Sequence, residues 1–70
     1  MEFTRYEERN GERALRRLSR KAFQVCSDYS PLSVYEREGK YYTRGIFEAD
    51  DLSFEELDRF FCDIADAMNG

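Results

Sequence analysis

The 70-residue chain contains no histidine and no tryptophan, and it has only one proline, four glycines and two cysteines. Without histidine, neither a Ser-His-Asp nor a Cys-His catalytic arrangement can form. The few glycines fall into neither a Walker-type loop nor a dinucleotide-binding fingerprint. We therefore expect a protein that is not an enzyme and that needs no cofactor.

The two cysteines and the acidic residues do not have the spacing of a metal site. Cys26 and Cys62 lack Cys-x-x-Cys spacing, and standard zinc sites need further thiol or imidazole ligands. Asp50-Asp51 and the acids after them lack the EF-hand pattern. We expect no bound metal and two reduced, half-buried thiols, with a disulfide or a reactive thiol as the alternative.

No apolar run approaches the roughly 20 residues that a membrane span requires, and the segment 1–10 is charged throughout. The sequence therefore predicts a cytoplasmic protein with no membrane partner. A chain of 70 residues predicts one domain, 1–70, with a small core that five tyrosines and six phenylalanines help to fill. Because such domains are marginally stable, a second copy of the chain is a candidate partner.

The clearest helix signal lies at the carboxyl end, where start, periodicity and stop agree. Ser53 is a good N-cap, and Glu56 completes a Ser-x-x-Glu capping box. Asn69-Gly70 then supplies a stop signal, so the pattern predicts a helix over 53–68. Its apolar stripe, which must be buried, consists of Phe54, Leu57, Phe61, Ile64, Ala65 and Met68.

A second helical pattern occupies 12–29, between the turn signal Asn10-Gly11 and the stop signal Ser30-Pro31. The alternation within 23–29 would also suit a strand. The apolar stripe of the predicted helix consists of Leu15, Leu18, Ala22, either Val25 or Cys26, and Tyr29.

The first residues, 1–11, are ambiguous. Phe3 to Tyr6 suit a short strand, whereas Thr4 and Glu7 would form a capping box for a helix running through Gly11. We favour an extended or strand-like start.

The segment 32–47 predicts a β-hairpin, because 33–37 and 40–47 are rich in β-branched and aromatic residues around Glu38-Gly39. A two-residue loop aligns Tyr35 with Tyr42 and Val34 with Thr43, which leaves Tyr35 and Tyr42 on the outer face. A register slip of one residue would exchange the two faces. The predicted fold class is a small two-layer α+β domain, ordered helix–β-hairpin–helix, with an extra N-terminal strand as an option.

The net charge of −4 conceals an asymmetry along the chain. Residues 1–22 carry seven cations and four anions, residues 23–49 three and four, and residues 50–70 one and seven. The local charges are therefore +3, −1 and −6. Such asymmetry informs the choice of partners rather than the fold.

The basic residues suggest one function. A predicted helical face carries Arg13, Arg16, Arg17 and Arg20, and these arginines would neutralise phosphates while outer-face tyrosines stack on unpaired bases. The alternatives are a solvated face, pairing with acids such as Glu12, and an acidic protein surface. This arrangement supports a small nucleic-acid-binding regulator as the alternative function.

The acidic residues suggest the function that we favour, a non-catalytic protein–protein interaction module for a basic surface of a larger protein. A solubilising acidic face is the competing interpretation. In size, acidity and absence of catalytic motifs the chain resembles, as a class, the small inhibitors and adaptors of phages and mobile elements. The predicted partner-binding residues are Glu55, Glu56, Asp63, Asp66, Phe60, Tyr35 and Tyr42.

Overall fold

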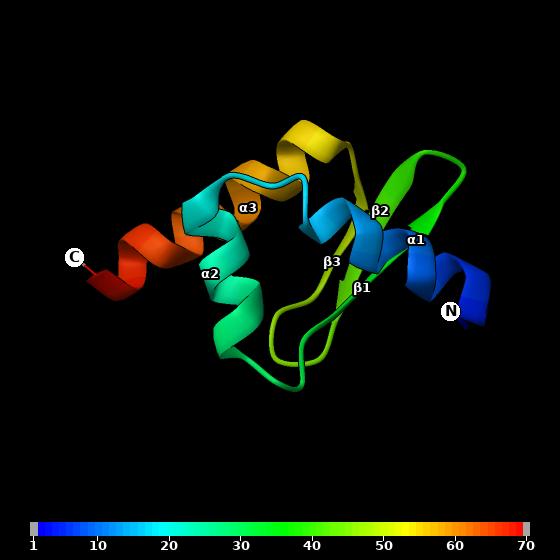
Figure 1. The fold of residues 1–70 in the computed structure, drawn as a ribbon, viewed down its shortest axis with the longest axis horizontal. Helices are drawn as coiled ribbons and strands as arrows, with labels where there is room; N and C mark the ends of the chain where they lie inside the picture. Colours follow the sequence, from blue (N-terminus) through cyan, green and yellow to red (C-terminus); the bar gives the residue numbers. More distant parts are fainter. Residues whose placement is uncertain (1, 70) are drawn as a thin grey trace.

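The computed structural model describes residues 2–69 and contains three helices and a three-stranded antiparallel sheet (Figure 1). The predicted α+β class and the helix, hairpin, helix order are confirmed, with two additions, a further helix and a third strand. In chain order the elements are α1 (Arg5–Leu15), α2 (Arg20–Asp28), β1 (Ser33–Arg37), β2 (Lys40–Arg44), β3 (Ala49–Leu52) and α3 (Phe54–Asn69).

The hairpin of β1 and β2 has the predicted register, with Tyr35 opposite Tyr42 and Val34 opposite Thr43. Glu38 and Gly39 form the two-residue loop, and both have positive φ, 52° and 79°. This backbone twist suits a tight hairpin between right-handed strands. The predicted inner face is also right, because Val34 and Thr43 are buried.

The strand β3 is an addition that the sequence did not predict. It pairs with β2 through Tyr41 opposite Leu52 and Thr43 opposite Ala49, with an irregular register between them. Asp51 has a φ of 58° within this irregularity. Because aspartate is disfavoured in strands, the composition of this segment does not indicate that it pairs with β2. Charge and irregularity at an outer strand also oppose edge-to-edge aggregation.

The predicted strand-like start over 1–11 is wrong, because α1 begins at Arg5. Thr4 is its N-cap, and the capping box is complete: the Glu7 N–H donates to Thr4 Oγ1 at 3.1 Å, and the Thr4 N–H donates to Glu7 Oε1 at 2.8 Å. These two bonds satisfy backbone groups that a helix start otherwise leaves unpaired. Met1, the first residue of that predicted segment, lies outside the described residues.

The predicted single helix over 12–29 is also wrong, because α1 ends at Leu15 and α2 begins at Arg20. Gly11 lies inside α1 rather than in a turn. A Cβ atom added to Gly11 would lie 2.0 Å from the Val34 carbonyl oxygen, so the glycine permits a close approach of helix to strand. α1 thus lies along β1, while α2 lies along α3 (Figure 1).

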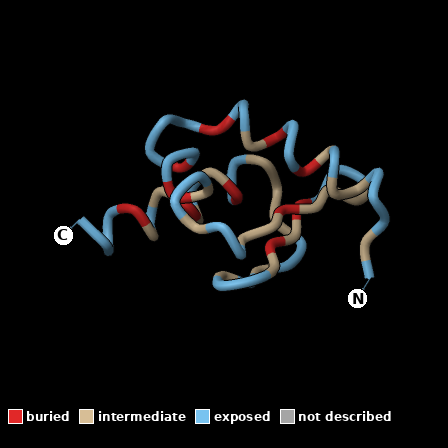
Figure 2. Tube along the Cα trace, turned by 60° about the horizontal axis from the view of Figure 1, so that its bottom comes forward, coloured by how far each residue is buried: buried red, intermediate tan, exposed pale blue. Residues whose placement is uncertain are grey.

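Side chains from the three helices and from the hairpin strands form one core. In Figure 2, buried stretches recur along the chain. Most of the predicted stripe of α3 is buried or half-buried. Met68 is the exception at 55% exposure, because it lies in the last turn of α3. Of the stop signal Asn69-Gly70, the glycine lies outside the described residues. The buried apolar residues are Ala14, Leu18, Ala22, Val25, Val34, Tyr41, Leu57, Phe61 and Ala65.

Candidate interaction surfaces

Four of the predicted partner-binding residues surround one shallow depression at the start of α3, which we call the acidic depression. They are Glu55, Glu56, Phe60 and Asp63, and the lining is completed by Leu52, Ser53 and Arg59. The carboxylates are exposed, whereas the aromatic and leucine side chains are half-buried. The depression therefore combines an acidic rim with an apolar floor.

Phe60 belongs partly to the core and partly to the acidic depression. Its ring packs edge-on against the fully buried Phe61, with 5.2 Å between the ring centroids. A half-buried ring is held in place by the core and still offers an apolar surface to a ligand.

Glu56 has a structural task at the rim of the acidic depression. Its carboxylate accepts the Ser53 backbone N–H at 2.8 Å, and its own N–H donates to Ser53 Oγ at 3.1 Å. This capping box, predicted from the sequence, is complete. The backbone bond from Ser53 lowers the pKa of Glu56, with smaller contributions from the Ser53 side chain and the charge of Lys40. The carboxylate is held as an anion beside the helix start.

Asp63 makes a loose contact across the surface of α3. The Arg59 Nε lies 3.6 Å from Asp63 Oδ1, and the two side chains are 82% and 65% exposed. Pairs this exposed contribute about 0–1 kcal/mol to folding. A cation from another molecule would therefore displace Arg59 at little cost.

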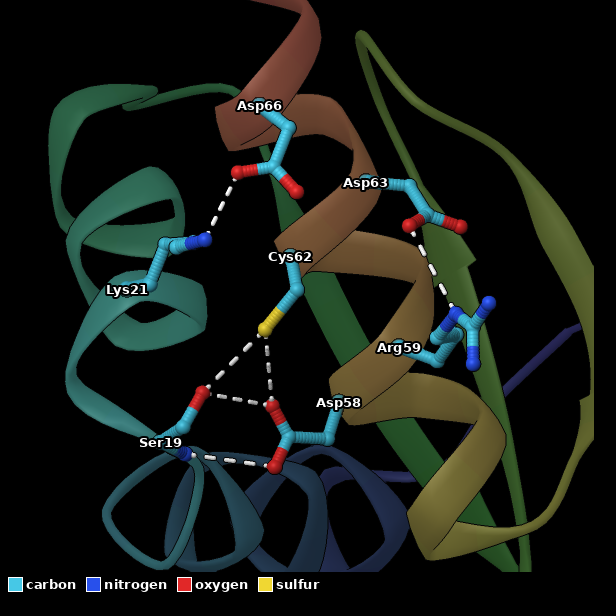
Figure 3. Close-up of polar contacts among 7 residues, drawn as sticks. All are labelled: Ser19, Lys21, Asp58, Arg59, Cys62, Asp63 and Asp66. Carbon is cyan, nitrogen blue, oxygen red and sulfur yellow. Dashed lines mark hydrogen bonds and ion pairs between the residues drawn. The ribbon is translucent and has the colours of Figure 1, made fainter. Parts of the chain in front are cut away.

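Asp66, although predicted with this group, faces α2 instead. Its Oδ1 lies 2.6 Å from Lys21 Nζ, and this hydrogen bond raises the pKa of Lys21. Figure 3 shows Asp66 directed toward Lys21 on one side of α3, while Arg59 and Asp63 lie on the other side. The acidic residues predicted as one partner-binding group are therefore divided between two sides of the helix.

Asp58 forms a polar contact between α3 and the start of α2 that the sequence did not predict. The Ser19 hydroxyl donates to Asp58 Oδ1 at 2.7 Å, and the Ser19 N–H donates to Oδ2 at 3.3 Å (Figure 3). The Ser19 hydroxyl bond is the largest cause of the lowered pKa of Asp58. A carboxylate at the N-terminus of α2 is also favoured by the helix dipole. A serine N-cap without an acid three residues later, as at Ser19, is the only local signal of such a partner.

Both cysteines are free and half-buried, as predicted. Cys62 Sγ lies 3.2 Å from Ser19 Oγ and 3.3 Å from Asp58 Oδ1, so it completes the contact in Figure 3. Burial raises the pKa of the Cys26 thiol to about 12, which keeps that thiol protonated and unreactive at neutral pH.

Tyr35 and Tyr42 lie on the outer face of the sheet, away from the acidic depression, and Phe3 covers them. The Phe3 ring stacks on Tyr35, with 4.4 Å between centroids and 8° between planes, and it lies 5.2 Å from the ring of Tyr42. The guanidinium groups of Arg37 and Arg44 lie 4.9 and 5.4 Å from the Phe3 centroid. A base could not take the stacking position on Tyr35 while Phe3 occupies it.

Phe3 was not recognised from the sequence as the partner of these tyrosines. One local signal existed, since Phe3 directly precedes the N-cap of α1, where an apolar residue usually packs on the fourth helical residue. That residue is Glu8, which cannot provide an apolar contact. Phe3 therefore packs on the tyrosines of the sheet instead of on its own helix.

The four arginines proposed for nucleic acid lie within and beside the bend between α1 and α2 rather than on one continuous helix. All four are exposed, and none forms an ion pair within residues 2–69; they are Arg13, Arg16, Arg17 and Arg20. The Arg17 guanidinium lies 4.6 Å from the centroid of the Phe54 ring. Pairing with Glu12, one of the alternatives, does not occur in the structure.

Comparisons with models of protein families, with curated proteins and with solved structures found no match for this chain. Over residues 2–69, none of the helices combines the length and the apolar character that crossing a membrane demands. The same part of the chain holds no group of three or more potential metal ligands. The candidate surfaces therefore rest on the geometry of this molecule alone.

Proposed function

We propose that the protein is a non-catalytic interaction module that binds a basic segment of a larger protein in the acidic depression. One observation carries this proposal: Glu55, Glu56, Phe60 and Asp63 surround a single depression with Leu52 in its floor. The outer-face tyrosines and Asp66 have other contacts and are not part of the proposed contact surface.

The depression suits lysine and arginine side chains. Such a side chain has a long apolar stem and a charged end, and it buries the stem where it can keep the charge solvated or paired. Leu52 and Phe60 would cover the stem, and the three carboxylates would surround the charged end. The weak Arg59–Asp63 contact already places one guanidinium at this rim. A partner's arginine would take over that position with better burial.

A small domain bound in this way would act in the cytoplasm as an inhibitor or adaptor. It would cover a basic surface of its partner, including a surface that otherwise holds nucleic acid, because its carboxylates compete for the same cations as phosphate groups do. This mode of action suits the class of small phage and mobile-element proteins.

The test is zero-length carboxyl–amine cross-linking in nuclease-treated lysate of the source organism, followed by mass spectrometry. We expect a discrete partner joined through its lysines to Glu55, Glu56 or Asp63. The Glu55→Lys/Asp63→Lys variant should lose that partner at least tenfold, because two attractive contacts become repulsive. A partner captured equally well by this variant would overturn the proposal.

A matched control is Glu12→Lys/Glu38→Lys, which makes the same charge change at two exposed glutamates on α1 and the hairpin loop. It should capture the partner as the unmodified protein does. Equal loss in both variants would mean that overall charge, not the acidic depression, drives capture, and this would also refute the proposal. Far-UV circular dichroism of each variant checks that the fold is retained.

A further inference from the structure

The cations of this protein fall into two groups that differ in their contacts. Of the eleven lysines and arginines, four form ion pairs in the described part of the chain: Lys21, Arg37, Arg44 and Arg59. Six of the others lie within residues 5–20, and all six are exposed. The segment from the first helix to the start of α2 therefore displays nearly all of the positive charge that the fold leaves uncompensated.

Three of these cations form a regular row, which we call the arginine row: Arg5, Arg9 and Arg13. They are four residues apart on α1, so they share one helix face and follow one another at about 6 Å along the axis. This face is opposite to the one that carries Gly11 and Ala14, which are buried against β1. The row therefore points to solvent.

An exposed aromatic residue lies beside the row. Tyr6 is 66% exposed, and it lines a shallow groove together with Asn10 and the three arginines of the row. Packing in the core therefore does not account for an aromatic residue at this position.

The acids of α1 do not neutralise the row. Glu7 is directed to Arg37, with its Oε1 2.9 Å from the guanidinium. Glu8 and Glu12 lie on the flank of the row away from Tyr6, and neither comes within ion-pair distance of an arginine. The groove between Tyr6 and the arginine row thus has a positive potential next to an aromatic surface.

We propose that this groove binds single-stranded nucleic acid, with the arginine row on the phosphates and Tyr6 stacked on an unpaired base. A guanidinium matches the geometry of a phosphate group and forms paired hydrogen bonds with it. Stacking on an aromatic side chain requires a base that is not enclosed in a duplex. A duplex or an acidic protein would use the arginines but would leave Tyr6 without this role. The proposal is independent of the acidic depression.

The test is fluorescence anisotropy with labelled 12-nucleotide oligo-dT and oligo-rU in 20–200 mM salt. Three phosphate contacts predict that the logarithm of the association constant falls with the logarithm of salt concentration with a slope of about −2. Arg9→Gln/Arg13→Gln should weaken binding at least tenfold in low salt and reduce the slope to about −0.7. The matched control Lys40→Gln/Arg59→Gln removes the same charge elsewhere and should stay within twofold.

Substitutions of Tyr6 distinguish the binding of single-stranded nucleic acid from the binding of other anions. Tyr6→Ala should weaken binding about fivefold or more, whereas Tyr6→Phe should retain it, because stacking needs the ring and not the hydroxyl. Preference for one oligonucleotide would show whether the natural ligand is DNA or RNA. The proposal fails if binding is insensitive to salt, if Tyr6→Ala has no effect, or if a duplex or polyglutamate competes as well as unlabelled oligo-dT.

Discussion

The α1–α2 region and α3 have equally regular apolar spacing, yet one is two helices and the other is a single helix. In α3 the buried residues recur at steps of four through Leu57, Phe61 and Ala65. In the first region they recur at steps of four and three through Ala14, Leu18, Ala22 and Val25. The spacing would suit one helix in both cases. Periodicity therefore reports which residues are buried, not whether the helix is continuous.

The difference comes from the surfaces that each region must cover. α3 packs along α2 and the sheet as one rod, whereas α1 packs on β1 and α2 packs on α3 (Figure 1). A straight helix could not follow both of these directions. The chain bends at 16–19, and Ser19 starts the second helix with the help of Asp58, which is 39 positions away.

The largest expected effect on stability concerns the packing of α1 against β1. Gly11→Ala should destabilise the protein by about 2–3 kcal/mol, because the new Cβ would lie 2.0 Å from the Val34 carbonyl oxygen and the helix must move away. Helix propensity alone predicts the opposite, a gain of about 1 kcal/mol. Urea unfolding followed by circular dichroism measures the difference in the free energy of unfolding.

The matched control for this variant is Glu12→Ala, at the next position and fully on the solvent side of α1. It should change the free energy of unfolding by no more than about 0.5 kcal/mol. A Gly11→Ala protein more stable than the parent would show that α1 does not lie against β1. Packing on β1 would then not explain why the first region is two helices while α3 is one.

A smaller effect is expected at the bend. In a double-mutant cycle of Ser19→Ala and Asp58→Ala, we expect a coupling energy of about 1 kcal/mol, because the two side chains share a hydrogen bond at the start of α2. Ser19→Ala with Asp63→Ala should be additive, since Asp63 is on the other side of α3 (Figure 3). Additivity in both cycles would mean that the bend does not depend on Asp58.

What the sequence predicted correctly depends on contacts between near neighbours. The Ser53–Glu56 capping box and the hairpin register around Glu38-Gly39 are decided within a few residues, and both are right. In the same way, the residues of the acidic depression lie together because one helix carries most of them.

What the sequence did not predict depends on distant partners. The pairing of β3 with β2, the stacking of Phe3 on Tyr35 and the contact of Lys21 with Asp66 join segments that periodicity treats as independent. Gly11 is an instructive case, because its sequence context predicts a turn, whereas in the structure it permits the close approach of α1 to Val34. No local pattern distinguishes these two uses of glycine.

The smallest expected effect is a difference in the pH dependence of stability between the capping boxes of α1 and α3. The hydrogen bond from the Arg37 side chain is the main cause that lowers the pKa of Glu7 from 4.5 to about 2, whereas the pKa of Glu56 is lowered by its bonds to Ser53 and, to a smaller extent, by the charge of Lys40. A lowered pKa in the folded state means that the carboxylate stabilises the protein above the unfolded value of 4.5. This stabilisation is lost as the pH falls from 4.5 toward 2.

Glu7→Gln and Glu56→Gln test this difference, because glutamine keeps the capping hydrogen bond and removes the titration. The melting temperature of each variant is compared with that of the parent protein between pH 2 and pH 6. The deficit of Glu7→Gln should be full at pH 6 and should shrink steadily toward pH 2, while the deficit of Glu56→Gln should change less. Identical pH profiles for the two variants would show that Arg37 adds nothing to the cap of α1, and that the two helix starts are equivalent despite their different surroundings.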